Sequence, residues 1–133
     1  MPITTTPSFA VVPQVGVGAV STANTSRDGT GTIVTILSAS AAGTKINEIV
    51  VHATSDPADS IVTVFLHDGS TAYLFDEFDL GNPTAASSVT TAARLARGYA
   101  NVVLPSGWSV RAAITAAPTA GVVNVFVLGA DLT

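Results

Sequence analysis

The stretch IVTVFLHDGSTAYLFDEFDL, Ile61 to Leu80, places two segments rich in β-branched and aromatic residues on either side of Asp68 and Gly69. Asp-Gly in such a setting is among the strongest short-range signals for a β-hairpin, because aspartate caps a tight turn and glycine accepts positive φ. The stretch therefore predicts two antiparallel strands joined by a loop of about three to five residues. His67 then ends the first strand.

Strand character extends along most of the chain, because threonine, valine and glycine are frequent while glutamate, lysine and leucine are scarce. Segments rich in proline and glycine separate seven or eight short strands, a spacing typical of a sandwich or barrel. Besides the hairpin strands SIVTVFLH and AYLFDEFDL, the predicted strands are GTIVTIL, TKINEIVVHA, RGYANVVLP, GWSVRAAIT and GVVNVFVLGA, with AVVPQVGVGAV as an eighth that Pro13 partly restricts to a sheet edge. One weak helical candidate runs from Thr84 to Gly98, and the alternative there is a long loop that enters a strand near Val89.

Side-chain alternation indicates which strand faces are buried. In WSVRAAIT, the residues Trp108, Val110, Ala112 and Ile114 share one face, which predicts a half-buried strand with Trp108 in the core. The segment from Val122 to Leu128 is apolar on both faces and only Asn124 interrupts it. A strand of that kind lies at the centre of a fold or at a contact between subunits.

The composition indicates a protein that contacts other proteins. The chain has 133 residues, which fits one domain, and 47% of them are hydrophobic while 11% are charged. A typical soluble domain is about 25% charged, so this one has to expose neutral and apolar surface. Extensive apolar surface usually marks a protein contact.

Several classes of function are disfavoured by the charge and residue content. The net charge is −4, and the one close basic pair, Arg94 and Arg97, is too small for a nucleic-acid backbone. The absence of cysteine excludes disulfide scaffolds and thiolate sites. The longest apolar runs are about half of the roughly 20 residues that a membrane-spanning helix needs. The stretch MPITTTPSFAVVPQ does not read as a secretory signal, so we expect synthesis in a cytoplasm.

The first thirty-one residues differ from the remainder. They contain a proline-rich start and the polar, turn-forming stretch STANTSRDGTGT. We therefore expect an extended N-terminal arm or edge segment over residues 1–31 that packs little core of its own, followed by a single domain over residues 32–133. An arm of this kind is either loose or ordered by lying on a neighbour.

The strongest catalytic alternative involves the two histidines of the chain. A nucleophilic serine motif of the Gly-x-Ser-x-Gly type does not occur, and two histidines cannot make a three-histidine metal site. His52, His67 and Asp68 remain a conceivable metal set, but their spacing does not single them out. The hairpin explains Asp68 and Gly69 without chemistry, so the turn interpretation is favoured.

Other motifs are also better explained by structure. Two acidic stretches offer carboxylates for calcium: Asp76, Glu77 and Asp79 in one, and Asp56 and Asp59 in the other. A solvated strand edge is the favoured interpretation. On such a strand, Glu77 and Asp79 point to one side and Asp76 to the other. The stretch GVGAV, which begins at Gly16, lacks the third glycine of a dinucleotide fingerprint because Ser21 stands there. The aromatic residues Trp108, Tyr73 and Tyr99 are too few and too scattered for a sugar or base platform.

Four short motifs occur along the chain: GTKI at the start of a strand, the hairpin FLHDG, the tyrosine just after that hairpin, and the turn LPSG before SVRA. In these motifs the region from Gly31 to Leu132 resembles small virion proteins of tailed bacteriophages. That resemblance implies a β-sandwich or jelly-roll module that decorates or cements a capsid, commonly as a trimer, or forms part of a tail. It assigns no binding residue, because these motifs are turns and strands.

We therefore predict an all-β fold, an antiparallel, jelly-roll-like sandwich of seven or eight strands with an N-terminal arm. The predicted function is a capsid decoration or cement protein of a tailed bacteriophage. It would sit on the capsid surface as a homotrimer bound to the major capsid protein or neighbouring virion proteins, with no nucleic acid and no membrane. We predict no enzyme activity, catalytic residue, cofactor or metal. The alternatives are a tail or fibre module that binds a host glycan or protein, and a small metal-dependent enzyme.

Overall fold

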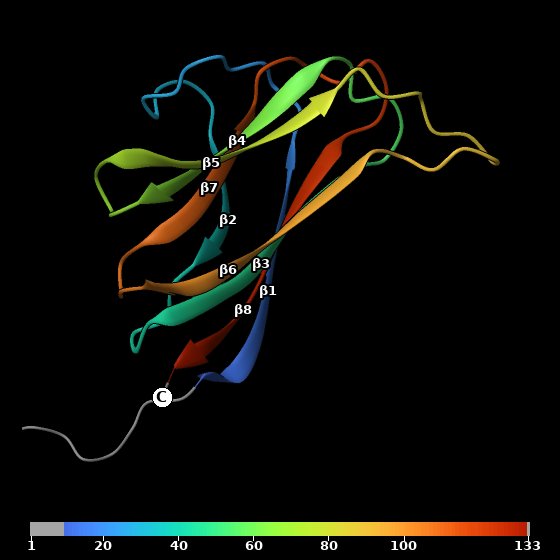
Figure 1. Ribbon diagram of the computed structural model, residues 1–133. Coiled ribbons are helices and arrows are strands. Elements are labelled where there is room, and N and C mark those ends of the chain that lie inside the picture. The colour runs from blue at the N-terminus through green and yellow to red at the C-terminus, as the bar shows by residue number, and fades with distance from the viewer. Residues whose placement is uncertain (1–9, 133) are drawn as a thin grey trace, which may run out of the picture.

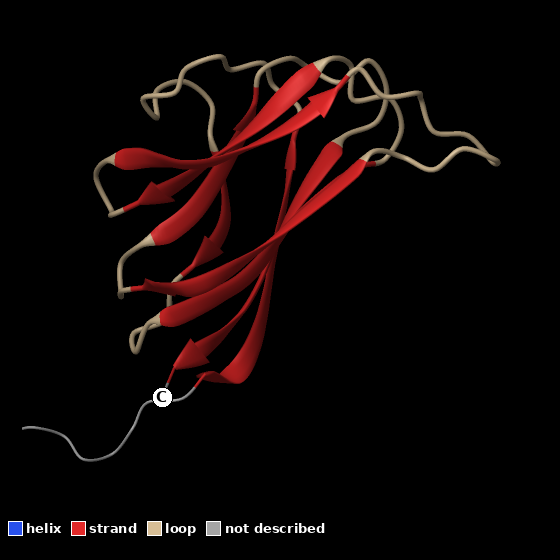
Figure 2. Ribbon diagram, in the orientation of Figure 1, coloured by secondary structure: helices blue, strands red, loops and turns tan. Residues whose placement is uncertain are grey.

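A computed structural model describes residues 10–132 of the chain, and within them every regular element is a β-strand (Figure 2). The strands confirm the predicted all-β class and the predicted number. They are β1 (Ala10–Val20), β2 (Val34–Ser38), β3 (Thr44–Ala53), β4 (Ser60–His67), β5 (Ala72–Gly81), β6 (Arg94–Leu104), β7 (Ser109–Ile114) and β8 (Val123–Leu132).

The strands form two four-stranded antiparallel sheets that face each other (Figure 1). The first sheet has the order β1-β8-β3-β6 and the second has the order β2-β7-β4-β5. The chain is therefore wound as four antiparallel pairs, β1 with β8, β2 with β7, β3 with β6, and β4 with β5. This is the strand order of a jelly roll.

The core lies between the sheets and follows the predicted alternation. Val123, Val125 and Val127 of β8 point inward and are fully buried. On the second sheet, every second residue of β7 from Val110 to Ile114 is also fully buried. Trp108 lies just before β7, where it is partly buried and packs against the core. The inward faces of both sheets thus supply the apolar area whose burial stabilises the fold.

Two glycines let the sheets approach each other along the side formed by β1 and β2. A Cβ atom at Gly16 would lie 2.3 Å from the carbonyl oxygen of Ile36, and one at Gly18 would lie 2.7 Å from the Ile36 Cδ1 atom. Both glycines point inward, because Gly16 is paired with the buried Val127. The stretch GVGAV is therefore a close contact between sheets, and no nucleotide loop is formed there.

The described part of the segment expected as an arm or edge segment over residues 1–31 contains the predicted eighth strand, which lies at a sheet edge. Ala10–Val20 pairs with β8 along its length as an edge strand of the first sheet. The following segment then crosses to the second sheet, where the Asn24 N–H donates to the Ile114 carbonyl over 2.8 Å and Arg27 pairs with Glu77. The described residues of the segment pack on their own domain because β1 supplies a paired, inward-facing strand, and the part of the expectation that falls on residues 1–9 lies outside the described residues.

The weak helical candidate is also wrong. Thr84 to Ala93 belongs to a long loop between β5 and β6, and the strand begins at Arg94, later than the position near Val89 that the alternative gave. Serine and threonine in this stretch make local side-chain bonds to the backbone, which compete with a helix. Ser87 shows this directly, because its Oγ accepts the N–H groups of Val89 and Thr90 over 3.2 and 3.1 Å.

Candidate interaction surface

The hairpin between β4 and β5 is held by its own side chains. The Asp68 Oδ1 atom accepts the N–H groups of Ser70 and Thr71 over 2.9 and 2.7 Å, and the His67 Nδ1 atom accepts the N–H of Gly69 over 3.0 Å. Gly69 has φ of 102°, as the turn requires. The backbone bonds from Thr71 and Ser70 lower the pKa of Asp68. Asp68 therefore caps the turn, as the sequence predicts, and His67 ends its strand as predicted and adds a second bond to the turn.

The residues of the conceivable metal set lie apart. His52 is exposed on β3 of the first sheet, beside Asn124 of β8 and Arg94 of β6. His67 ends β4 of the second sheet, next to Ser109. Among residues 10–132, no three histidine, aspartate or glutamate side chains gather closely enough to hold a metal ion.

The acidic strand β5 divides its charges as predicted. Glu77 and Asp79 lie on the outer side, where Glu77 pairs with Arg27 and Asp79 accepts the N–H of Gly81 over 2.8 Å. Asp76 points the other way, toward Arg97 and Tyr99 of β6 in the first sheet. Asp56 is engaged in its own turn, where it accepts the N–H of Ala58 over 3.0 Å.

A polar cluster that was not predicted from the sequence joins the two sheets at their β5 and β6 edges. Asp76 accepts hydrogen bonds from Arg97 and from the Tyr99 hydroxyl, and the Arg97 guanidinium lies 4.9 Å from the centre of the Phe78 ring. Phe75 packs on Tyr99 with ring centres 5.2 Å apart. The sequence does place Arg97 and Tyr99 on one face of a strand. That spacing indicates a cluster only once β5, with Asp76, is known to lie opposite.

The ionisation of this cluster is set by burial and by its hydrogen bonds. Burial acts to raise the pKa of Asp76, but the bonds from Tyr99 and Arg97 outweigh it and the net pKa is lowered. Burial and the bond to Asp76 raise the pKa of the Tyr99 hydroxyl. Asp76 is thus charged and Tyr99 neutral over the ordinary range of pH, which suits a clamp between sheets.

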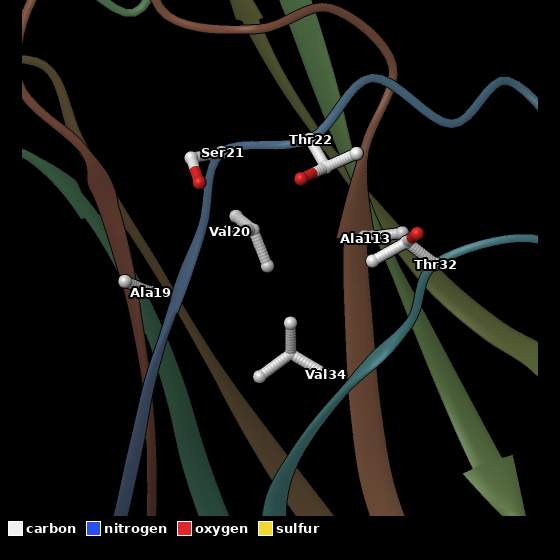
Figure 3. Close-up of a pocket in the computed structure, with 7 residues that line it drawn as sticks. All are labelled: Ala19, Val20, Ser21, Thr22, Thr32, Val34 and Ala113. Carbon is white, nitrogen blue, oxygen red and sulfur yellow. The ribbon is translucent and has the colours of Figure 1, made fainter.

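A small hollow lies where the chain leaves β1 and enters β2 (Figure 3). Its volume is about 40 Å³, against the roughly 300–1,000 Å³ of a typical ligand pocket. The hollow is large enough for a few water molecules and too small for a substrate. Its lining residues are Ala19, Val20, Ser21, Thr22, Thr32, Val34 and Ala113.

Two aromatic residues that lie far apart in the sequence, Tyr73 and Trp108, lie together in the fold, contrary to the prediction that the aromatic residues are scattered. The rings of Tyr73 and Trp108 are stacked, with centres 6.5 Å apart and planes inclined by 22°. Tyr73 is 52% exposed, and its hydroxyl donates to Asp68 over 3.4 Å. The hairpin and the turn before β7 come together through the pairing of β4 with both β5 and β7, which local spacing does not reveal. Tyr99 is separate from this pair.

The outer face of the first sheet is apolar along β1 and β8. On β1 and β8, every second side chain points outward, away from the core. The outward valines of β1 are well exposed, with Val15 at 65% and Val17 at 55%. Phe126 and Leu128 lie beside them on β8 and are half-buried. The two apolar faces predicted for Val122 to Leu128 are therefore one face in the core and one on this surface.

No family model matches the chain, and no curated protein matches its sequence. A solved structure does match in fold. It is a chain from a structure described as the acidic stable capsid of Helicobacter pylori bacteriophage KHP30, with a TM-score of 0.56 and 16% sequence identity. The match covers 96% of this chain and 95% of that chain, so the whole jelly roll is shared.

Between residues 10 and 132 the structure contains no helix with the length and apolar character needed to cross a bilayer.

Proposed function

We propose that the chain is a structural virion protein of a tailed bacteriophage, and more closely a decoration protein that stabilises the head. It binds the major capsid protein and other copies of itself, as a homotrimer. The observation that carries the proposal is the end-to-end fold match with a chain of a phage capsid structure. The resemblance of the hairpin and turn motifs to small virion proteins supports it independently.

The proposed mechanism is burial of surface, and it requires no catalysis. The outer face of β1 and β8 offers exposed valines beside Phe126 and Leu128. With 11% charged residues, the chain has few ionised groups to strip of water when another protein covers it. Contacts of on the order of 1,000 Å² or more are needed for a lasting shell. In the proposal, the chain assembles in the host bacterial cytoplasm and ends on the capsid surface.

The test is a reconstitution on particles. Capsids of the encoding phage that lack this chain are incubated with the purified protein, sedimented, and heated while DNA release or shell melting is followed. We expect saturable co-sedimentation and a higher melting temperature of the shell. Labelled protein found at the tail alone, or no binding to capsids, would refute the decoration role.

A glycan-binding role in the tail is the second candidate, and the stacked pair of Tyr73 and Trp108 favours it. Tyr73 is 52% exposed and its hydroxyl donates to Asp68, so an apolar ring and a hydrogen-bond acceptor lie side by side at the surface. Titration with host-surface glycans, using Trp108→Ala as the comparison, tests this candidate. Saturable binding that the substitution abolishes would favour the tail over the head.

A further inference from the structure

The loop between β5 and β6 extends away from the body of the sandwich (Figure 1). Its twelve residues, Asn82 to Ala93, contain no charged side chain. The tip is a turn in which the Ser87 N–H donates to the Thr90 carbonyl over 2.9 Å while the Ser87 Oγ accepts the N–H groups of Val89 and Thr90. The turn presents Val89, which is 92% exposed.

Single exposed apolar side chains are common on protein surfaces, but here an ordered turn holds the valine at the end of a projecting loop, where it is free to contact another surface. Among the exposed large apolar side chains of residues 10–132, Val89 has the highest exposed fraction, and Val15 follows at 65%. Burying a valine fully is worth roughly 1.5–3 kcal/mol, so the loop has an apolar anchor ready for a contact.

The chain also contains an uncharged surface that matches such an anchor. On the outer face of the first sheet, the half formed by β1 and β8 exposes Val15 and Val17 beside Phe126 and Leu128. The charged residues of that face, such as Glu48 and Arg94, stand on β3 and β6. The β1–β8 half-face is therefore neutral and apolar.

The distribution of acidic residues favours a second copy of the chain as the occupant. Two copies that each carry a net charge of −4 repel each other, and contacts through acidic regions increase the repulsion. Of the nine acidic residues, Glu48 alone points outward from the first sheet, and the other eight lie in loops, on β5 of the second sheet, or inward at Asp131. The uncharged loop and the neutral half-face are thus the surfaces through which two copies meet at least cost.

We propose that the β5–β6 loop of one copy docks, through Val89, on the β1–β8 half-face of the next copy. This inference deepens the proposed function, because it assigns the surfaces through which the chain associates with itself. The two surfaces differ, so the contact is head-to-tail and closes into a ring when the rotation allows.

The size of the contact explains why a ring is needed. Two strands about 4.8 Å apart and about ten residues long span roughly 10 Å by 33 Å, or about 300 Å² per side. One such contact buries about 600 Å² in total, below the roughly 1,000 Å² of a specific interface. In a closed ring each copy makes two contacts, and the buried area per copy doubles.

The test is the mass of the full chain in solution, by light scattering or sedimentation from about 1 to about 100 µM. Val89→Asp and Val17→Asp each place a charge in the proposed contact, and Ser106→Asp adds the same charge to an exposed turn at the other end of the sandwich. We expect the wild type and Ser106→Asp to form the ring, and both valine variants to dissociate at least tenfold more readily. Val89→Asp is the decisive variant because a loop side chain that is 92% exposed has no packing to lose.

Three results would overturn the inference. In the first, the wild type is a monomer throughout, which means that no second copy covers the half-face. In the second, Val17→Asp dissociates the oligomer and Val89→Asp leaves it intact, which means that the half-face receives another part of the second copy. In the third, neither valine variant changes the mass. Loss of capsid binding with the ring retained would count against the decoration role alone.

Discussion

Replacing Asp76 with asparagine removes the charge at the centre of the clamp between the sheets while keeping the shape of the side chain. The Asp76 side chain is 17% exposed and accepts bonds from Arg97, from the Tyr99 hydroxyl and from the backbone N–H of Glu77. Hydrogen bonds to a charged group contribute roughly 1.5–3 kcal/mol, but Arg97 is 50% exposed and its ion pair is screened by water. We expect a loss of about 1–2 kcal/mol in the free energy of unfolding at pH 7.

The assay is urea unfolding followed by circular dichroism at several pH values. A slope of about 1.5 kcal/mol per M for a domain of this size converts the expected loss into a midpoint lower by about 1 M. The folded state lowers the pKa of Asp76 below 3.8, so its charge stabilises the fold above that value, and this contribution is lost as the pH falls through the folded pKa. The difference between wild type and Asp76→Asn therefore shrinks as the pH falls below about 4.

The matched control is Asp59→Asn, at an exposed aspartate in the loop before β4, which should leave the midpoint within about 0.3 M at pH 7. The reasoning is refuted if Asp76→Asn has the same midpoint as the wild type at pH 7. It is equally refuted if the difference between the two proteins stays constant down to pH 2.5.

Three further substitutions test the turn, the sheet contact and the core. Gly16→Ala should lower the free energy of unfolding by about 1–3 kcal/mol, because the added methyl group would meet the Ile36 carbonyl. In the control Gly98→Ala, the added methyl group would lie 3.8 Å from its nearest neighbour atom, so thermal unfolding should be nearly unchanged. Asp68→Ala should lower the melting temperature more than Asp68→Asn, because the amide oxygen can still accept the turn N–H groups; equal melting temperatures would contradict the capping role. Phe78→Ala should cost about 3–5 kcal/mol in denaturant unfolding, since Phe78 is buried between the sheets, and a cost below 1 kcal/mol would place it outside the core.

The hairpin shows how far local sequence carries. Asp68 and Gly69 have few alternatives to a turn between two β-rich segments, and the structure forms that turn with the side-chain caps that the residue types imply. The Val122–Leu128 segment is similar, because a strand apolar on both faces has to be covered on at least one. These features were predictable because the interactions that decide them lie within a few residues.

The N-terminal segment shows what local reasoning leaves open. Its residues allowed an arm or an edge strand, and only the fold shows that Ala10–Val20 pairs with β8, more than a hundred residues later in the chain. The two glycines of GVGAV acquire their role only from the approach of β2 across the sandwich. A segment of weak intrinsic preference takes the structure that its distant partner provides.

The sequence by itself determined the all-β class, the turn at His67 to Gly69, the alternation of buried residues and the scarcity of charge. Only the tertiary structure decided that Asp76, Arg97 and Tyr99 form one cluster, that Tyr73 stacks on Trp108, and that a neutral half-face and a projecting valine are left exposed. The physical reason is that turns and alternation arise between neighbours in the chain. Clusters and surfaces arise from strands that pair across long separations, and the order of those strands is a property of the whole fold.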